Sequence, residues 1–147
     1  MLIETLQHVL AADAGMQSYL GTPSTRSDST NGIFPTQALD GSSLTMPYLV
    51  LSQVSGEPME TAMEGTGRLT KERWRFSCSG STYKQAKKFA KYVRSFVISL
   101  YGQQPVGNAE IHGAWMKLEA DDAVALGKGT MYQTHIDVEL QYIDGDN

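Results

Sequence analysis

The sequence predicts one α+β domain over residues 1–147: a mainly antiparallel four-stranded sheet covered by two helices, with long extended loops. Three observations predict this class. Apolar residues recur at helical spacing in two segments and alternate with polar residues in others. Two stretches rich in Gly, Ser, Thr and Pro, 21–47 and 56–67, interrupt these patterns. A length of 147 residues with 41% apolar content suits a single core.

Both expected helices are amphipathic. The first opens the chain and loses its pattern by residues 13–15, and a short turn over 16–20 follows. The second begins after Thr82, because Thr82 and Gln85 have the spacing of a capping box, and it ends before Gly102. Their inward stripes are Leu2, Ile3, Leu6, Val9 and Leu10 in the first helix, and Ala86, Phe89, Ala90, Val93, Phe96, Val97 and Leu100 in the second.

Four segments have the pattern of strands. They cover residues 48–55, 69–79, the region around 111–119 and, after a loop over 121–129, residues 131–142. Side chains alternate between the two faces of a strand, so one face of 69–79 carries Trp74, Phe76 and Cys78 and the other carries Arg73, Arg75 and Ser77. The lone Cys78 is therefore expected to be a plain core residue. The last strand likewise has one face in the core and one face that is exposed to solvent or lies at an interface.

The charges are segregated along the chain. Nine of the twelve cationic side chains fall within Arg68–Arg94, where Glu72 is the only acid, so this basic segment carries +8. The stretches before and after it each sum to −6. Such blocks favour a protein that places a basic face against an acidic one, on its own copies or on a partner.

No motif points to catalysis or to a cofactor. His8, His112 and His135 lie far apart in sequence, without neighbouring ligands at metal-binding spacing, so no metal is expected. The acidic cluster Glu119, Asp121 and Asp122 has the residue types of an acid–base pair, but beside a turn we interpret it as a solvated edge. No signal peptide or membrane-spanning run is present, so assembly in the host cytoplasm is expected.

The lysines of the second helix break local rules. Lys84 with Lys88, and Lys87 with Lys91, are like-charge pairs four residues apart. Lys84 also stands in the first turn, where the helix dipole disfavours cations. A complementary acidic surface is one explanation, a solvated face that maintains solubility is a second, and nucleic acid is a third.

The order of short segments resembles the tail-completion, or tail-terminator, proteins of long-tailed bacteriophages. The resemblance covers residues 2–142. It is carried by the opening helix that runs into Ala11-Ala12-Asp13-Ala14-Gly15, by Met46-Pro47-Tyr48-Leu49-Val50, Ser55-Gly56-Glu57-Pro58, Ser81-Thr82-Tyr83 before a helix with Ala86, Lys87 and Ala90, the 115–119 strand and the terminal alternating strand.

This resemblance implies a non-enzymatic virion protein without a cofactor. It implies a ring, with six subunits by analogy, at the head-proximal end of the tail tube, where it ends tube polymerisation and provides the head-docking surface. The implied partners are further copies of the chain, the tail tube protein and the head–tail connector protein. DNA would pass through the lumen without sequence-specific binding, and no membrane is involved.

Two expectations about the interface follow from the residues. The cations are expected at subunit or ring-to-ring contacts, and a mobile 56–67 loop is expected to become ordered on assembly against a neighbouring copy. The alternative function is a nucleic-acid-binding or head–tail connector accessory protein that uses the basic 68–94 segment. The candidate interface residues are Arg73, Arg75, Lys84, Lys87, Lys88, Lys91, Arg94, Glu57, Glu60 and Glu64.

Overall fold

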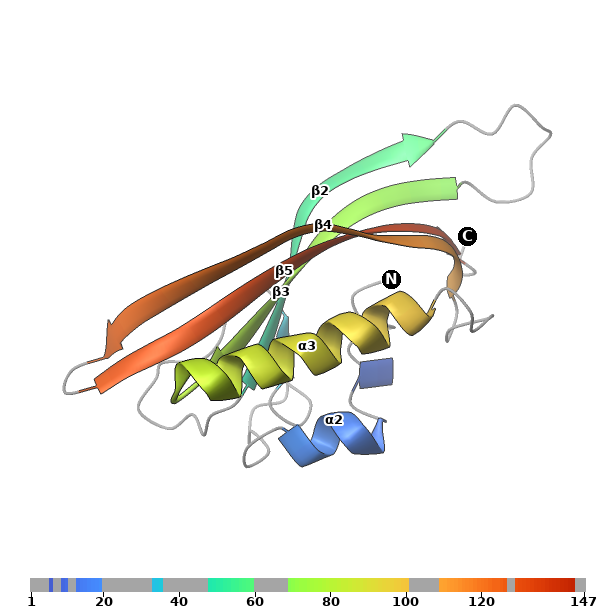
Figure 1. Ribbon diagram of the computed structural model, residues 1–147. Coiled ribbons are helices and arrows are strands. Elements are labelled where there is room, and N and C mark those ends of the chain that lie inside the picture. Colours follow the sequence, from blue (N-terminus) through green and yellow to red (C-terminus); the bar gives the residue numbers. More distant parts are fainter. Residues whose placement is uncertain are drawn as a thin grey trace.

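In the part of the chain that this computed structural model describes, four long antiparallel strands form most of a sheet, and helices lie on one face of it (Figure 1). The structure describes residues 6, 9–10, 13–19, 33–35, 48–59, 69–100, 109–126 and 129–144. The elements are α2 (Ala14–Tyr19), β1 (Ile33–Pro35), β2 (Tyr48–Met59), β3 (Leu69–Gly80), α3 (Tyr83–Ser99), β4 (Ala109–Leu126) and β5 (Gly129–Asp144). None of the helices in this described part is long and apolar enough to cross a membrane.

The strand order in the sheet is β1-β2-β3-β5-β4. The pairs β2–β3, β3–β5 and β5–β4 are all antiparallel, which confirms the predicted class of sheet. The three-residue β1 was not predicted. It pairs in parallel with the start of β2, from Ile33 opposite Leu49 to Pro35 opposite Leu51. β1 lies inside the 21–47 stretch, where sequence composition indicated only loop.

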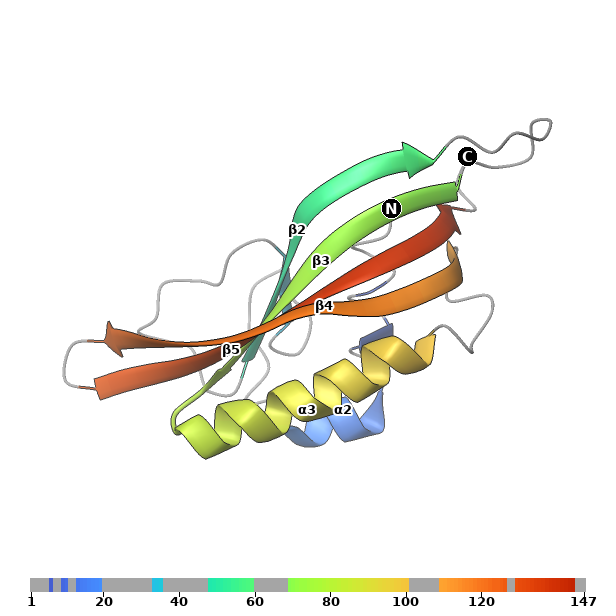
Figure 2. The same cartoon turned by 45° about the horizontal axis from the view of Figure 1, so that its top comes forward.

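Both labelled helices lie on the same face of the sheet, as two views show (Figures 1 and 2). We call this the inner face, and the opposite one the outer face. The sequence predicted a turn over 16–20, but Ala14–Tyr19 forms a helix. Asp13 explains the difference, since its Oδ2 accepts a hydrogen bond from the Met16 backbone N–H at 2.8 Å and so caps the helix. The Tyr92 hydroxyl of α3 donates to the same oxygen.

The predicted N-cap of α3 is present, but the second hydrogen bond of the capping box goes to Ser81 instead of Thr82. Thr82 is the N-cap and its Oγ1 accepts from the Gln85 backbone N–H at 3.1 Å. The Gln85 Oε1 does not return to Thr82 as in a standard capping box. It accepts from the backbone N–H and the hydroxyl of Ser81, both at 2.8 Å. The two residues therefore hold the chain where it turns from β3 into α3.

The core fills the space between the inner face and the helices. Most of the apolar stripe predicted for α3 is fully buried, and Phe96 is partly buried against the core. Leu6 and Leu10 are also buried, and they have helical backbone as predicted for the start of the chain. Cys78 is a buried core residue, as expected. The sheet contributes Leu49, Leu51, Trp74, Phe76, Cys78, Ile111, Ile136, Val138, Leu140 and Tyr142.

Two strands are longer than the sequence predicted. Residues 56–59, expected to be loop, continue β2 and pair with Leu69–Glu72 of β3. Pro58 is tolerated there because β1 pairs only with residues 49–51, so the rest of β2 is an edge that needs no backbone donor on that side. Residues 121–126, also expected to be loop, continue β4 and pair with Gly129–Thr134. The loop interpretation is thus wrong for both segments, and residues 60–67 lie outside the described part.

We predict that Thr82→Ala lowers the free energy of unfolding by about 1 kcal/mol, because the Gln85 N–H loses its acceptor at the start of α3. Urea denaturation followed by circular dichroism measures this. Ser95→Ala, at an exposed position inside the same helix, is the control and should change stability little. Equal effects of the two substitutions would contradict the role of the cap.

Candidate functional site

The structure divides the predicted interface cations between two surfaces. Arg73 and Arg75 lie on β3 and point to the outer face of the sheet, away from the core residues Trp74 and Phe76. The remaining cations stand on α3, on the inner side of the sheet. Glu57 lies in β2, and Glu60 and Glu64 lie outside the described residues. The basic segment therefore does not form one continuous face. Its α3 members are Lys84, Lys87, Lys88, Lys91 and Arg94.

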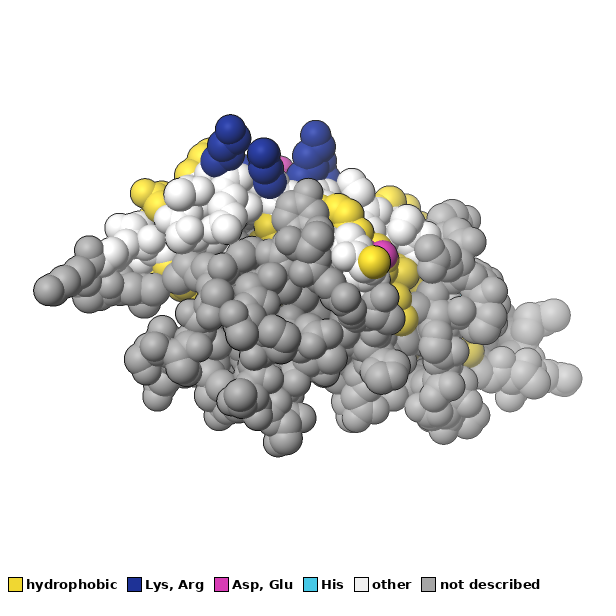
Figure 3. Space-filling view, turned by 90° about the horizontal axis from the view of Figure 1, so that it is seen from below, with side chains coloured by type: hydrophobic (Ala, Val, Ile, Leu, Met, Phe, Trp, Pro, Cys, Tyr) yellow, Lys and Arg dark blue, Asp and Glu magenta, His cyan; other side chains and the backbone are white. Residues whose placement is uncertain are grey.

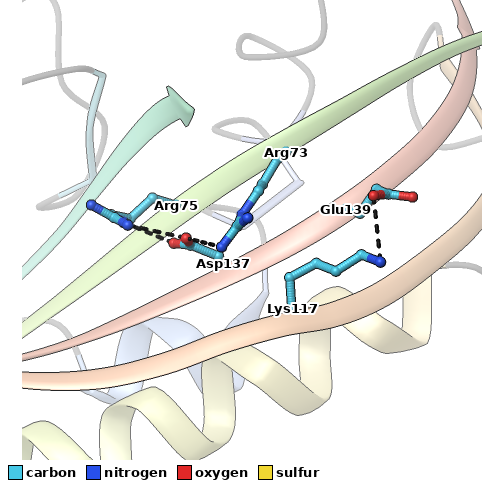
Figure 4. Close-up of polar contacts among 5 residues, drawn as sticks. All are labelled: Arg73, Arg75, Lys117, Asp137 and Glu139. Atoms are coloured by element: carbon cyan, nitrogen blue, oxygen red, sulfur yellow. Dashed lines mark hydrogen bonds and ion pairs between the residues drawn. The ribbon is translucent and has the colours of Figure 1, made fainter. Parts of the chain in front are cut away.

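On the outer face, Arg73 and Arg75 converge on one carboxylate, Asp137 of β5 (Figure 4). Arg75 makes two bonds, from Nε to Oδ1 at 2.8 Å and from an Nη to Oδ2 at 3.0 Å. Arg73 donates to Oδ2 at 2.9 Å. The Asp137 side chain has no exposed surface, whereas those of Arg73 and Arg75 are 35% and 38% exposed. The buried carboxylate of Asp137 is thus paired with two guanidinium groups. The alternation of core and polar faces along the strand did not predict a buried charge on the outer face.

The charges shift the protonation of this cluster. Burial by itself raises the pKa of Asp137, but the hydrogen bonds and positive charges of Arg75 and Arg73 outweigh burial and hold the pKa below its usual value. The hydrogen bond to Asp137 raises the pKa of Arg75. The Nε of Arg73 is buried, and it has no hydrogen-bond partner among the described residues. The cluster stays charged at neutral pH.

A shallow polar hollow adjoins this cluster. Its volume is about 260 Å³, and Ser55, Lys71, Arg73, Lys117 and Glu139 line it. Lys117 of β4 approaches Glu139 of β5, with 3.6 Å between Nζ and Oε2 (Figure 4). Among the described residues, the lining carries three cations and one carboxylate.

Two exposed apolar side chains border the same area. Trp115 is 45% exposed and pairs across β4–β5 with Glu139, while Leu118 is 40% exposed and pairs with Asp137. Sequence reasoning placed neither residue in the interface. The register shift around His112 turns Trp115 to the outer face, and alternation counted along a sequence does not reveal such a shift.

On α3, two of the predicted interface cations are already paired within the chain. Lys87 Nζ lies 2.8 Å from Asp121 and 3.9 Å from Glu119 of β4. Arg94 reaches Glu119 at 4.0 Å. The hydrogen bond between Lys87 and Asp121 raises the pKa of Lys87 and lowers that of Asp121. The acidic cluster is therefore a solvated edge that also forms ion pairs with α3 of the same chain, through Glu119 and Asp121.

The other three lysines of α3 are exposed. Lys84, Lys88 and Lys91 make no ion pair with any described residue. Figure 3 views the molecule from the helix side and shows Lys and Arg side chains standing out from one margin of this surface. We call these three residues the lysine row. The row has the exposure that a contact with an anionic surface requires.

The basic segment therefore serves two purposes in the described part of the chain. Arg73, Arg75, Lys87 and Arg94 neutralise carboxylates of β4 and β5 within the same subunit. The segregated charges of these four residues thus have partners within the subunit, and their place at an interface stays a prediction. The place of the lysine row at an interface is likewise a prediction.

Two further titratable side chains, His135 and Cys78, lie within the packed sheet. His135 Nδ1 lies 2.8 Å from the Ser77 hydroxyl, and burial followed by the charge of Arg75 lowers the pKa of this histidine. Burial raises the pKa of the Cys78 thiol far above its usual value. Within the residues that the structure describes, no three His, Cys, Asp or Glu side chains come together as a metal site would require.

The fold is similar to that of a chain from a virus-like particle. A solved structure titled "Virion of native gene transfer agent (GTA) particle" contains a chain that matches with a TM-score of 0.61 at 15% sequence identity. The match covers 95% of this chain and 93% of that one. The sequence matches no protein-family model, and no curated protein matches it. The similarity establishes a shared fold along nearly the whole chain.

We predict that Asp137→Asn lowers the free energy of unfolding by about 1–3 kcal/mol at pH 7, because two guanidinium groups lose a charged acceptor. The pKa of Asp137 is lowered by folding, so its contribution is present above the unfolded value, about 3.9, and is lost as pH falls through the lower folded value. The variant should lack this component of acid destabilisation. Urea denaturation between pH 2 and 7 measures both effects.

The control is Glu139→Gln. Glu139 lies on the same strand and face as Asp137, is more exposed than Asp137, and pairs with Lys117. It should cost less than about 1 kcal/mol. If both substitutions had equal effects and equal pH dependence, the buried cluster would not contribute as described.

Proposed function

We propose that this chain is a virion structural protein. In this proposal it forms a closed ring, of six subunits by the family resemblance, at the head-proximal end of a tail tube. The ring ends tube polymerisation and offers the surface on which the head docks. Its partners are its own copies, the tail tube protein and the head–tail connector protein, and DNA passes through its lumen without sequence-specific contacts.

The whole-chain similarity to a chain of a gene transfer agent virion is the observation that carries this proposal. It agrees with the order of sequence segments that resembles the tail-completion proteins. An assembly role also suits the described surface, which presents exposed charge and exposed apolar side chains rather than a deep pocket. Subunits of a ring contact each other head to tail, so each copy must carry two different surfaces that fit together.

A nucleic-acid-binding or connector accessory role is the second candidate, and the lysine row favours it. Three exposed lysines along one helix form a basic strip without described acidic partners. Such a strip contacts phosphates and makes binding steeply dependent on salt. The formal net charge of −4 weighs against this candidate.

Particles assembled without this protein test the proposal. We expect tails of uncontrolled length that are not joined to heads, as seen by electron microscopy, and restoration when the purified protein is supplied. Native mass spectrometry of the protein, with and without tail tube subunits, should show a closed oligomer. Tails of normal length joined to heads in its absence would contradict the proposal. Salt-steep duplex DNA binding without oligomer formation would favour the second candidate.

We predict that changing Lys84, Lys88 and Lys91 together to Glu leaves the subunit folded but weakens assembly at least about tenfold. All three side chains are exposed, and a glutamate at position 84 suits the helix dipole better than lysine. Charge reversal should repel an acidic surface and alter the salt dependence of assembly. Sedimentation velocity at several ionic strengths measures this.

The matched control is the triple change of the same residues to Gln, which removes the charges without reversing them. Its effect should lie between those of the wild type and the Glu variant. If the Glu variant assembles like the wild type with an unchanged salt dependence, the lysine row is a solvated face.

A further inference from the structure

We propose that the contact between β4 and α3 is autoinhibitory, because it weakens the binding of α3 to an acidic protein surface in the free subunit. Two acids of β4 occupy two cations of α3, and an incoming acidic surface displaces those acids. The acids are Glu119 and Asp121, and the cations are Lys87 and Arg94. The inference rests on the proposed assembly role, since it takes such a surface, on another virion protein, as the partner of α3.

The five cations of α3 form one continuous group. Residues three or four positions apart on a helix are neighbours, with about 5–6 Å between their Cβ atoms. Lys87 stands three positions after Lys84 and four before Lys91. Arg94 stands three positions after Lys91. Lys87 and Arg94 therefore border the lysine row on the same helix.

Carboxylates of β4 pair with the two cations that border the lysine row. Asp121 Oδ1 lies 2.8 Å from Lys87 Nζ. Glu119 lies 3.9 Å from Lys87 and 4.0 Å from Arg94. Two positive charges of α3 thus meet two negative charges of the same subunit, whereas the lysine row makes no ion pair with any described residue. The free subunit therefore offers an anionic partner fewer charges than α3 carries.

Neighbouring side chains hold Asp121 in place for this pairing. Its carboxylate accepts hydrogen bonds from the Thr134 hydroxyl at 3.0 Å and from the Tyr83 hydroxyl at 3.2 Å. Lys87 Nζ also lies 5.8 Å from the centre of the Tyr83 ring, within the range of a cation–π contact. Because the carboxylate is already fixed, the ion pair costs less side-chain entropy than a pair of two mobile surface side chains.

The four paired side chains nevertheless remain open to solvent. Their exposed fractions lie between 33% and 39%. Water and salt ions reach these pairs, so each contributes little to stability and a second anion can compete for the cation. The Asp137 cluster on the outer face differs, because its carboxylate has no exposed surface. The pairs between α3 and β4 therefore suit reversible shielding, and the buried cluster does not.

Such shielding lowers the apparent affinity of α3 without a change of fold. A site that is available for only a fraction of the time binds with an affinity reduced by that fraction. Free subunits would therefore associate weakly in solution. At the end of a tube several contacts form together, and their combined affinity displaces the acids more readily than a single contact does. The shielding would thus favour assembly at the tube end.

Two adjacent residues of β4 provide a matched test, with labelled poly-L-glutamate as the acidic probe. Asp121 pairs with α3, whereas Asp122 accepts a hydrogen bond from the Ala123 backbone N–H and makes no ion pair with any described residue. Asp121→Asn should bind the probe about 2- to 5-fold more tightly than the wild type. Asp122→Asn removes the same charge one residue away and should change binding less. Fluorescence anisotropy of the full chain at low ionic strength measures this.

Equal effects of the two substitutions would overturn the inference. It is also overturned if neither the wild type nor Asp121→Asn binds the probe. Circular dichroism and the urea midpoint of each variant check that the subunit is folded.

The gain in binding should depend on Lys87. In a Lys87→Gln background, Asp121→Asn should give no more gain than Asp122→Asn, because the shielded cation is absent. In a Lys88→Gln background the full gain should remain, since Lys88 makes no ion pair with any described residue. These double-mutant cycles isolate the pair of Lys87 with Asp121. A gain that persists without Lys87 overturns the inference.

Sedimentation velocity extends the test to assembly and separates the inference from the proposed ring. Asp121→Asn should form oligomers at a concentration about 2- to 5-fold lower than the wild type. Glu119→Gln leaves the contacts of Asp121 in place and should act in the same direction. If the wild type assembles but neither substitution strengthens assembly or probe binding beyond Asp122→Asn, the inference is overturned and the ring stands. If the gain in probe binding appears but every variant stays monomeric, alone and with tail tube subunits, the ring is contradicted and the shielding of α3 stands.

Discussion

The antiparallel pairing of β3 with β5 is the interaction on which the rest of the structure depends. These two strands are joined over twelve register pairs at the centre of the sheet. Because the faces of a strand alternate, this pairing sets Phe76 and Ile136 into the core and brings Arg75 opposite Asp137 on the outer face. A shift of one residue would expose the apolar set and bury unpaired charges. The hydrophobic core and the buried ion cluster therefore require the same register.

The paired charges also determine which surfaces remain for partners. A fully buried carboxylate held by two guanidinium groups is costly to disturb, since loss of both guanidinium groups would leave its charge desolvated and unpaired. The main role of the Arg73 and Arg75 cluster is thus to stabilise the folded subunit, and any role as a contact surface is secondary. The ion pairs of Lys87 and Arg94 join α3 to β4 and link the helix layer to the edge of the sheet. The lysine row remains exposed on the helix side of the sheet and makes no ion pair with any described residue.

The edge strand β4 shows how local irregularity creates a surface. Strict alternation from Ile111, which faces the core, would place Gly113 and Trp115 on the inner face. The extra residue at His112 reverses the alternation, so Ala114 and Met116 pack inward and Trp115 turns outward. The extra residue at Lys117 restores the original phase for Glu119 and Asp121, which can then meet Lys87 of α3. Bulges and a lysine also make a long exposed edge a poor template for uncontrolled strand pairing.

The sequence by itself determined the α+β class, the amphipathic stripe and N-cap of α3, and the burial of Trp74, Phe76 and Cys78. Each of these follows from local periodicity or from contacts within a few residues along the chain. Tertiary structure alone decided that Asp13 caps a helix, that β2 and β4 extend through segments rich in turn-forming or acidic residues, and that Trp115 faces outward. It also decided which cations are neutralised internally, because Asp137 lies 62 residues from Arg75 in sequence. Register and bulges set such long-range partners, since they depend on the neighbouring strand and leave no signature in the sequence of one strand.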